Sequence, residues 1–139
     1  MFQRNGVQYE FHHLGLPTSV ARPNERYSAK FGMHTSDGDC ETIRMQWHRS
    51  DPDSPLHSLI RSMPHLAFKV DDLSLAVQGQ KLLLEPYEPI EGFRVAIIED
   101  GGLPIELIQT RLADEEIWAI AKEPECSSLY GESTSSSGT

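Results

Sequence analysis

A short pattern that occurs twice is the feature that most constrains the fold of this chain. Residues 13–18 (HLGLPT) align with residues 65–70 (HLAFKV), and both segments run from His-Leu to a small residue and then to an apolar one. Further along, residues 45–47 (MQW) align with residues 105–107 (IEL), each with one polar residue of a metal-ligating type between two apolar residues. A repeat of this kind is typical of a domain that contains two copies of one supersecondary unit.

The repeat predicts the fold class and brings the chemistry to one place. We expect an α+β fold of two β-α-β-β-β modules, about residues 9–50 and 62–110, related by pseudo-twofold symmetry. The modules would form a partly closed, mostly antiparallel β-barrel with a cleft. The first and last members of the pattern are 33 residues apart in the first half and 41 in the second. This arrangement would bring four side chains to the cleft: His13, Gln46, His65 and Glu106.

The first half of the chain shows one strong strand and a long irregular stretch. Residues 9–17 alternate without a helical stripe, which predicts a strand with His12 on the opposite face from His13. Residues 18–39 are rich in loop-forming residues, with at most a short helix around 25–31. Residues 41–48 alternate again, and residues 56–61 can form one or two helical turns after a turn cluster at 51–55. Residues 1–8 are expected to be a loose extension.

The second half follows a clearer order. Residues 65–70 read as a strand, Asp71 and Asp72 as an N-cap, and residues 73–78 as a short helix that ends at Gly79. Three further strands are predicted at 81–85, 93–99 and 104–110, with a tight turn at Gly101 and Gly102. The single domain is predicted to span residues 1–112. A C-terminal helix at 113–126 and a disordered tail at 127–139 would follow.

Composition narrows the classes of partner. The net charge of −9 argues against nucleic acid or an anionic membrane, because both require a basic surface. Two cysteines are too few for a disulfide framework or a cysteine-rich zinc site. No apolar run is long enough to span a membrane, and no secretory signal is visible. We therefore expect a cytoplasmic protein whose partner is a small-molecule substrate.

The repeat resembles the vicinal oxygen chelate superfamily, which includes glyoxalase I, methylmalonyl-CoA epimerase and extradiol dioxygenases. The resemblance covers roughly residues 9–110, and its most specific segments are residues 11–16 (FHHLGL), 64–73 (PHLAFKVDDL) and 98–108 (IEDGGLPIELI). It implies a first-strand ligand at His13, a second-module ligand at His65 and a last-strand ligand at Glu106. Gln46 falls where glyoxalase-like members carry their remaining ligand. The first-module helix departs from the family, because the corresponding stretch is polar and contains proline.

The chemistry of these residues suits one divalent metal ion: Zn, Mn, Ni, Co or Fe. Neutral imidazole and carboxylate bind divalent first-row metals and here leave coordination positions open, as a catalytic site requires. The resemblance implies chelation of a substrate's adjacent oxygens and stabilisation of the charge that develops on them. Isomerisation also needs a base, and Glu106, His48 or Tyr87 can serve.

Each residue also has a simpler explanation. A lone histidine on a strand is more often a hydrogen-bonded structural residue, and a polar residue such as Gln46 on an alternating strand is often solvated. Surface placement is the default for His34, His48 and His57. Tyr27 and Arg94 are further candidates for substrate contact.

Three functions remain open from the sequence. The first is a metal-dependent lyase or isomerase of glyoxalase type. The second is a non-haem Fe(II) dioxygenase that uses His13, His65 and Glu106 alone. The third is a metal-free protein that sequesters a small molecule such as a drug. A homodimer is expected, since in several relatives each site takes ligands from two chains.

Overall fold

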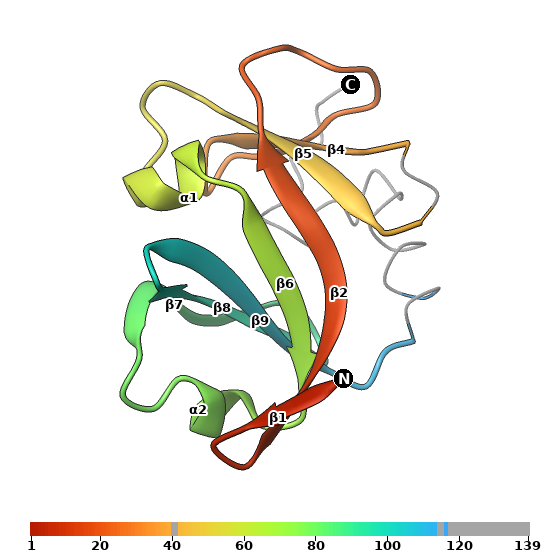
Figure 1. Ribbon diagram of the computed structural model, residues 1–139. Helices are drawn as coiled ribbons and strands as arrows, with labels where there is room; N and C mark the ends of the chain where they lie inside the picture. Colours follow the sequence, from red (N-terminus) through yellow and green to blue (C-terminus); the bar gives the residue numbers. More distant parts are fainter. Residues whose placement is uncertain (40–41, 114–115, 117–139) are drawn as a thin grey trace.

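The described residues of the computed structural model, 1–39, 42–113 and 116, form one curled mixed sheet with two short helices (Figure 1). The sheet is mostly antiparallel, and its main path runs β3-β4-β5-β2-β6-β9-β8-β7, with β1 paired to β2. The strands are β1 (Phe2–Arg4), β2 (Val7–Pro17), β3 (Arg26–Ser28), β4 (Met33–Asp37), β5 (Met45–Ser50), β6 (His65–Val70), β7 (Lys81–Ile90), β8 (Phe93–Asp100) and β9 (Leu103–Thr110). The helices are α1 (Ser58–Ser62) and α2 (Leu73–Ala76).

Strand pairing follows the same order on either side of the central pair. β2 runs antiparallel to β6 in the middle of the sheet. β2 also pairs in parallel with β5, and β6 pairs in parallel with β9. Beyond these, β4 pairs with β5 and β8 with β9, both antiparallel. The result is a curled, mostly β half-barrel, which agrees with the coarse architecture expected from the repeat.

Two sequence-based expectations for the first half are wrong. Residues 1–8 are not a loose extension, because β1 pairs with β2 through a turn at Asn5 and Gly6, both of which have positive φ. No helix occurs at residues 25–31: β3 lies there, and β4 follows it within the stretch expected to be loop. These strands carry several polar residues, and their positions depend on pairing with β5 rather than on local propensity.

The second half agrees more closely with the prediction. β6 matches the predicted bounds, and the Asp72 side chain accepts a hydrogen bond from the Leu75 backbone N–H as the N-cap of α2. β7 continues past its predicted end through Pro86 and Pro89, which an edge strand tolerates because one row of its backbone groups is not paired. The predicted C-terminal helix and tail fall almost wholly on residues outside the described part of the chain.

A β-bulge in β2 decides which side chains face the interior of the curled sheet. Phe11 pairs with Phe68, yet His13, not His12, pairs with Ala67, so β2 contains one extra residue at this point. Before the bulge, Tyr9 packs in an aromatic cluster with Phe68 on the outer face. After the bulge, the same odd-numbered positions point inward, because an extra residue reverses the alternation.

The two faces of the sheet bury separate cores. The outer core lies under α2 and includes Val7, Leu73, Ala96 and Leu107, each 0% exposed. The inner, concave face buries Ala67, Phe93, Val95 and Ile108, and a neighbouring cluster under α1. The concave face therefore has an apolar lining around the positions that carry the repeated polar residues.

Candidate metal centre

Two cross-strand rows place the four repeated polar residues on the concave face. In one row, Gly15 of β2 lies between Gln46 of β5 and His65 of β6. In the next row, Ala67 of β6 lies between His13 of β2 and Glu106 of β9. The middle member of each row is small, so the longer side chains on either side have room to meet above it.

The ring of His65 fills the space directly over Gly15. A Cβ atom added at Gly15 would overlap the imidazole ring of His65, with its Nδ1 only 2.6 Å away. β2 is held on both sides by β5 and β6, so its backbone has little freedom to move aside. The position of the His65 ring therefore requires a residue without a Cβ atom at position 15.

Three ligand atoms converge in the centre of the site. His65 Nε2 lies 3.1 Å and His13 Nε2 lies 3.5 Å from the same oxygen, Oε1 of Glu106. Of the described residues, these three form a group whose ligand atoms all lie within 4.8 Å of one another. The three residues are almost completely buried, at 0% exposure for His13, 6% for His65 and 3% for Glu106.

The protonation states are those that a metal requires. Burial lowers the pKa of His13, although the Glu106 carboxylate opposes this shift, which favours the neutral imidazole. Burial by itself would raise the pKa of Glu106, but its electrostatic and hydrogen-bond interactions with His13 and His65 outweigh burial and lower that pKa, which favours the carboxylate. A carboxylate beside neutral imidazole is the ligand state that binds a divalent ion.

The distances also fit one shared metal ion. Donor atoms about 2.1 Å from a metal at angles of about 90–110° lie about 3.0–3.4 Å apart. The two measured separations to Glu106 Oε1, 3.1 Å and 3.5 Å, are close to this range. Glu106 Oε2 is buried and has no hydrogen-bond partner among the described residues. Buried polar atoms are normally satisfied, so this atom fits the role of a metal ligand.

Gln46 adds a fourth donor from the neighbouring row. Its side chain is 0% exposed, and its Nε2 donates to Asp37 Oδ1 at 3.4 Å. Its amide oxygen, Oε1, is buried without a hydrogen-bond partner among the described residues. A buried amide oxygen on the same face as two histidines and a carboxylate is a suitable neutral metal ligand.

Two histidines next to the centre lie differently from the sequence-based expectation. Alternation predicts His12 on the opposite face, but the bulge brings its Nδ1 to 2.8 Å from Nδ1 of His13. His48 is expected at the surface, but it is 7% exposed, bonds Thr35 Oγ1 through Nδ1 at 3.0 Å and packs its ring 5.2 Å from that of His65. Burial, followed by the nearby histidines, holds the pKa of His48 well below its usual range.

The burial of His48 could have been predicted from the sequence, whereas the position of His12 could not. His48 follows Gln46 by two positions on β5, so strand alternation already places both side chains on one face. The position of His12 depends on the bulge, and no pattern in the sequence marks that extra residue. The remaining histidines behave more as expected: His57 is exposed and caps α1, and His34 is partly buried.

A narrow apolar pocket opens beside the centre. Its polar end contains His48, His65 and Glu106, and its wall includes Tyr87 of β7 and Val95 of β8. Its cavity volume of about 30 Å³ has room for about two water molecules. Burial raises the pKa of Tyr87 far above its usual value, so the phenol stays neutral and acts as a hydrogen-bond donor or acceptor.

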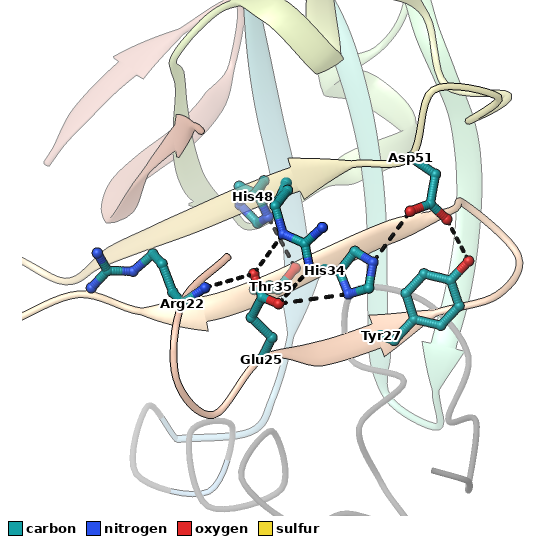
Figure 2. A network of polar contacts seen from close by, with 8 residues as sticks. Arg22, Glu25, Tyr27, His34, Thr35, His48 and Asp51 are labelled. Carbon is teal, nitrogen blue, oxygen red and sulfur yellow. Dashed lines mark hydrogen bonds and ion pairs between the residues drawn. The ribbon is translucent and has the colours of Figure 1, made fainter. Parts of the chain in front are cut away.

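The two other candidate substrate contacts are not among the residues that line this pocket. Figure 2 shows Tyr27 in a polar network, where its hydroxyl donates to Asp51 Oδ2 at 2.6 Å. His34 contacts Asp51 at 3.2 Å and Glu25 at 3.8 Å (Figure 2). Glu25 also accepts two hydrogen bonds from Arg49. Arg94 follows Phe93 on β8 and precedes pocket-lining Val95, so alternation directs it to the outer face.

Comparison with solved structures supports the fold. The structure is similar to the crystal structure of hypothetical protein BH1468 from Bacillus halodurans C-125, with a TM-score of 0.58 and 14% identity over 76% of this chain and 96% of that one. A crystal structure of methylmalonyl-CoA epimerase from Mycobacterium tuberculosis also aligns, with a TM-score of 0.49 and 19% identity over 74% of this chain and 89% of that one. No family model matches the sequence. No curated protein matches it either.

Fold and site together define a mostly β protein with one curled mixed sheet and a buried group of residues that can hold a metal ion. The three closest ligand atoms come from a single chain, so they can converge without a second copy, and the expected homodimer stays a prediction. Within the described residues, no helix is long and apolar enough to cross a membrane.

Proposed function

We propose that this protein is a metal-dependent lyase or isomerase that acts on a small substrate chelated through adjacent oxygens. The observation that carries the proposal is the convergence of His13, His65 and Glu106 at a buried point beside a pocket. Gln46 would complete the ligand set. A bound divalent ion would supply Lewis acidity, which polarises the substrate oxygens and lowers the pKa of the adjacent C–H.

The residues of the chain supply the proton transfer in this proposal. Glu106 is the catalytic residue: its carboxylate lines the pocket and takes the proton from the carbon next to the chelated oxygens. Return of that proton to a neighbouring atom, or of a proton to the other face of the carbon, completes an isomerisation or an epimerisation without another reactant. Tyr87 keeps its proton and offers a hydrogen bond to the substrate, and the ring of neutral His48 packs against that of His65 and limits its movement.

A non-haem Fe(II) dioxygenase is the second candidate, because two histidines and one carboxylate form the facial triad of that class. Gln46 separates the two functions. If its buried amide oxygen is a ligand, the set has four protein donors and is glyoxalase-like. If only the other three residues bind, the site suits iron and oxygen.

Metal analysis tests the ligand set directly. Protein purified without chelators is expected to hold about one Zn, Mn, Ni or Co ion per chain, and the His65→Ala variant is expected to lose it. His57→Asn is the matched control, because it also removes an imidazole but keeps a side-chain acceptor for the Leu59 N–H. Stoichiometric iron with oxygen uptake on a catechol would favour the dioxygenase. Unchanged metal content in His65→Ala would refute both functions.

Solvent exchange tests the chemistry whichever product the reaction forms. In D₂O, the metal-loaded protein is expected to exchange the α-proton of one or more small α-hydroxy carbonyl compounds, followed by proton NMR. Glu106→Gln keeps the shape of the side chain and removes its basicity, so exchange should fall by at least about 100-fold. Exchange at an undiminished rate in Glu106→Gln, with metal still bound, would remove Glu106 from its catalytic role.

A further inference from the structure

The pocket next to the candidate metal centre changes character sharply along its length. Among the described residues, its polar end consists of His48, His65 and Glu106. The rest of its wall is apolar and comes from residues around α1, β4, β7 and β8, among them Phe31, Met33, Leu56, Ile60, Leu84 and Ile97. None of the described lining residues is a lysine or an arginine.

The apolar wall of the pocket consists of buried, closely packed side chains. Phe31, Met33, Leu56, Ile60 and Ile97 form one packed cluster, and each is between 6% and 9% exposed. Phe31 and Tyr87 meet edge to face with their ring centroids 5.4 Å apart. Packed side chains of this kind hold the shape of the wall, so a group that enters the pocket meets a fixed apolar surface.

Lys30 is a cation close to the apolar wall of the pocket, and its contribution to binding can be bounded. Lys30 is exposed, and its Nζ lies 5.1 Å from the ring centroid of Tyr87 and 5.4 Å from that of Phe31. An ion pair with such an exposed ammonium group strengthens binding by at most about fivefold. Transfer of a carboxylate from water into the apolar wall weakens binding by far more than that. The balance therefore disfavours an anionic group inside the pocket.

We propose that the substrate of this site is a compact oxygen chelator whose remaining part is a short, uncharged aliphatic group held in the apolar pocket. This inference rests on the proposed metal-dependent function and adds the substrate class. It disfavours phosphorylated compounds and substrates whose carboxylate must enter the pocket. The chelating oxygens would lie at the polar end, and the apolar group would lie against the cluster around Phe31 and Ile60.

Hydroxamic acids provide a suitable probe, because they chelate divalent ions through two adjacent oxygens. We would titrate zinc-loaded protein with aceto-, butano- and hexanohydroxamic acid by calorimetry. Affinity should rise about fourfold for each methylene that becomes buried, until the pocket is full. The monohydroxamate of succinic acid, which has a carboxylate tail, should bind at least about tenfold more weakly than butanohydroxamic acid, which has the same number of carbons.

A matched pair of variants locates the effect in the pocket. Leu84→Asn places an amide in the partly buried wall and should weaken hexanohydroxamic acid about tenfold, with little change for acetohydroxamic acid. Leu75→Asn makes the same change on exposed α2, outside the pocket, and should alter neither affinity. The chain-length series on the unmodified protein stands even if a variant does not fold.

The outcomes separate this inference from the proposed function. Metal-dependent binding of acetohydroxamic acid with no gain from longer chains would overturn the apolar substrate class alone. Equal or tighter binding of the carboxylate-tailed compound would do the same. Failure of the protein to bind metal, or of acetohydroxamic acid to bind in a metal-dependent way, would overturn the proposed function and this inference with it.

Discussion

Replacement of Gly15 by alanine adds a single methyl group and should weaken metal binding while the protein still folds. The new Cβ would overlap the His65 ring, which lies directly over Gly15. Since β2 is paired on both sides, the ring of His65 must move rather than the strand. His65 Nε2 is 3.1 Å from Glu106 Oε1, so a shift of the ring disturbs the point where the ligand atoms meet.

The expected size of the effect follows from the role of His65. A displaced ligand should weaken metal binding about 10–100-fold, which corresponds to about 1.4–2.7 kcal/mol. Overpacking of the concave face should also lower the free energy of unfolding of the metal-free protein by about 1–3 kcal/mol. In a domain of this size, saturating metal should therefore raise the melting temperature of Gly15→Ala by about 3–11 °C less than it raises that of the unmodified protein.

Gly79→Ala is the matched control. Gly79 has a φ of +72°, and a Cβ there would meet nothing within 4 Å. Alanine in this conformation lowers stability by about 1–2 kcal/mol through backbone strain alone. Both variants should thus lose stability, but only Gly15→Ala should lose metal affinity, measured by competition with a chromophoric chelator. Unchanged zinc affinity in Gly15→Ala would refute the view that His65 is a ligand held over Gly15.

Three further predictions follow from the surroundings of the site. His12→Phe removes the contact with His13 Nδ1 and should weaken metal binding by about tenfold or more, whereas metal affinity in His57→Asn should not change. Burial lowers the pKa values of His13 and His48, so between about pH 6.5 and those lowered values the unfolded chain binds more protons than the folded one. The free energy of unfolding of the metal-free protein should then fall as the pH falls, by up to about 1.4 kcal/mol per pH unit for each histidine. In urea unfolding, His48→Phe should reduce this dependence on pH. An unchanged dependence would contradict the view that buried, neutral His48 contributes to it. Glu25→Gln disrupts the paired hydrogen bonds to Arg49 and should lower stability by about 1 kcal/mol. Zinc affinity should not change, because neither Glu25 nor Arg49 is a candidate ligand or lines the pocket; a parallel loss of zinc affinity would contradict this.

The second half of the fold was largely predictable because its signals are local. Asp72 caps α2 with its own side chain, and Gly101 and Gly102 form the β8–β9 turn with φ values of +63° and +83°. The first half was not, since β3 and β4 exist only through their pairing with each other and with β5. A strand of polar residues without local alternation of apolar ones carries no signal that a single sequence can reveal.

The sequence by itself determined which residues belong together. The repeated His-Leu-small pattern and the polar residue between two apolar ones singled out His13, His65, Glu106 and Gln46, and the structure places all four in adjacent rows of one sheet. Only the tertiary structure decided how they meet. The bulge at His12 and His13 reverses the alternation of β2, and the curl of the sheet turns Gln46 and His48 inward. Alternation predicts which side chains share a face, but the register and curvature of paired strands decide which face becomes the interior.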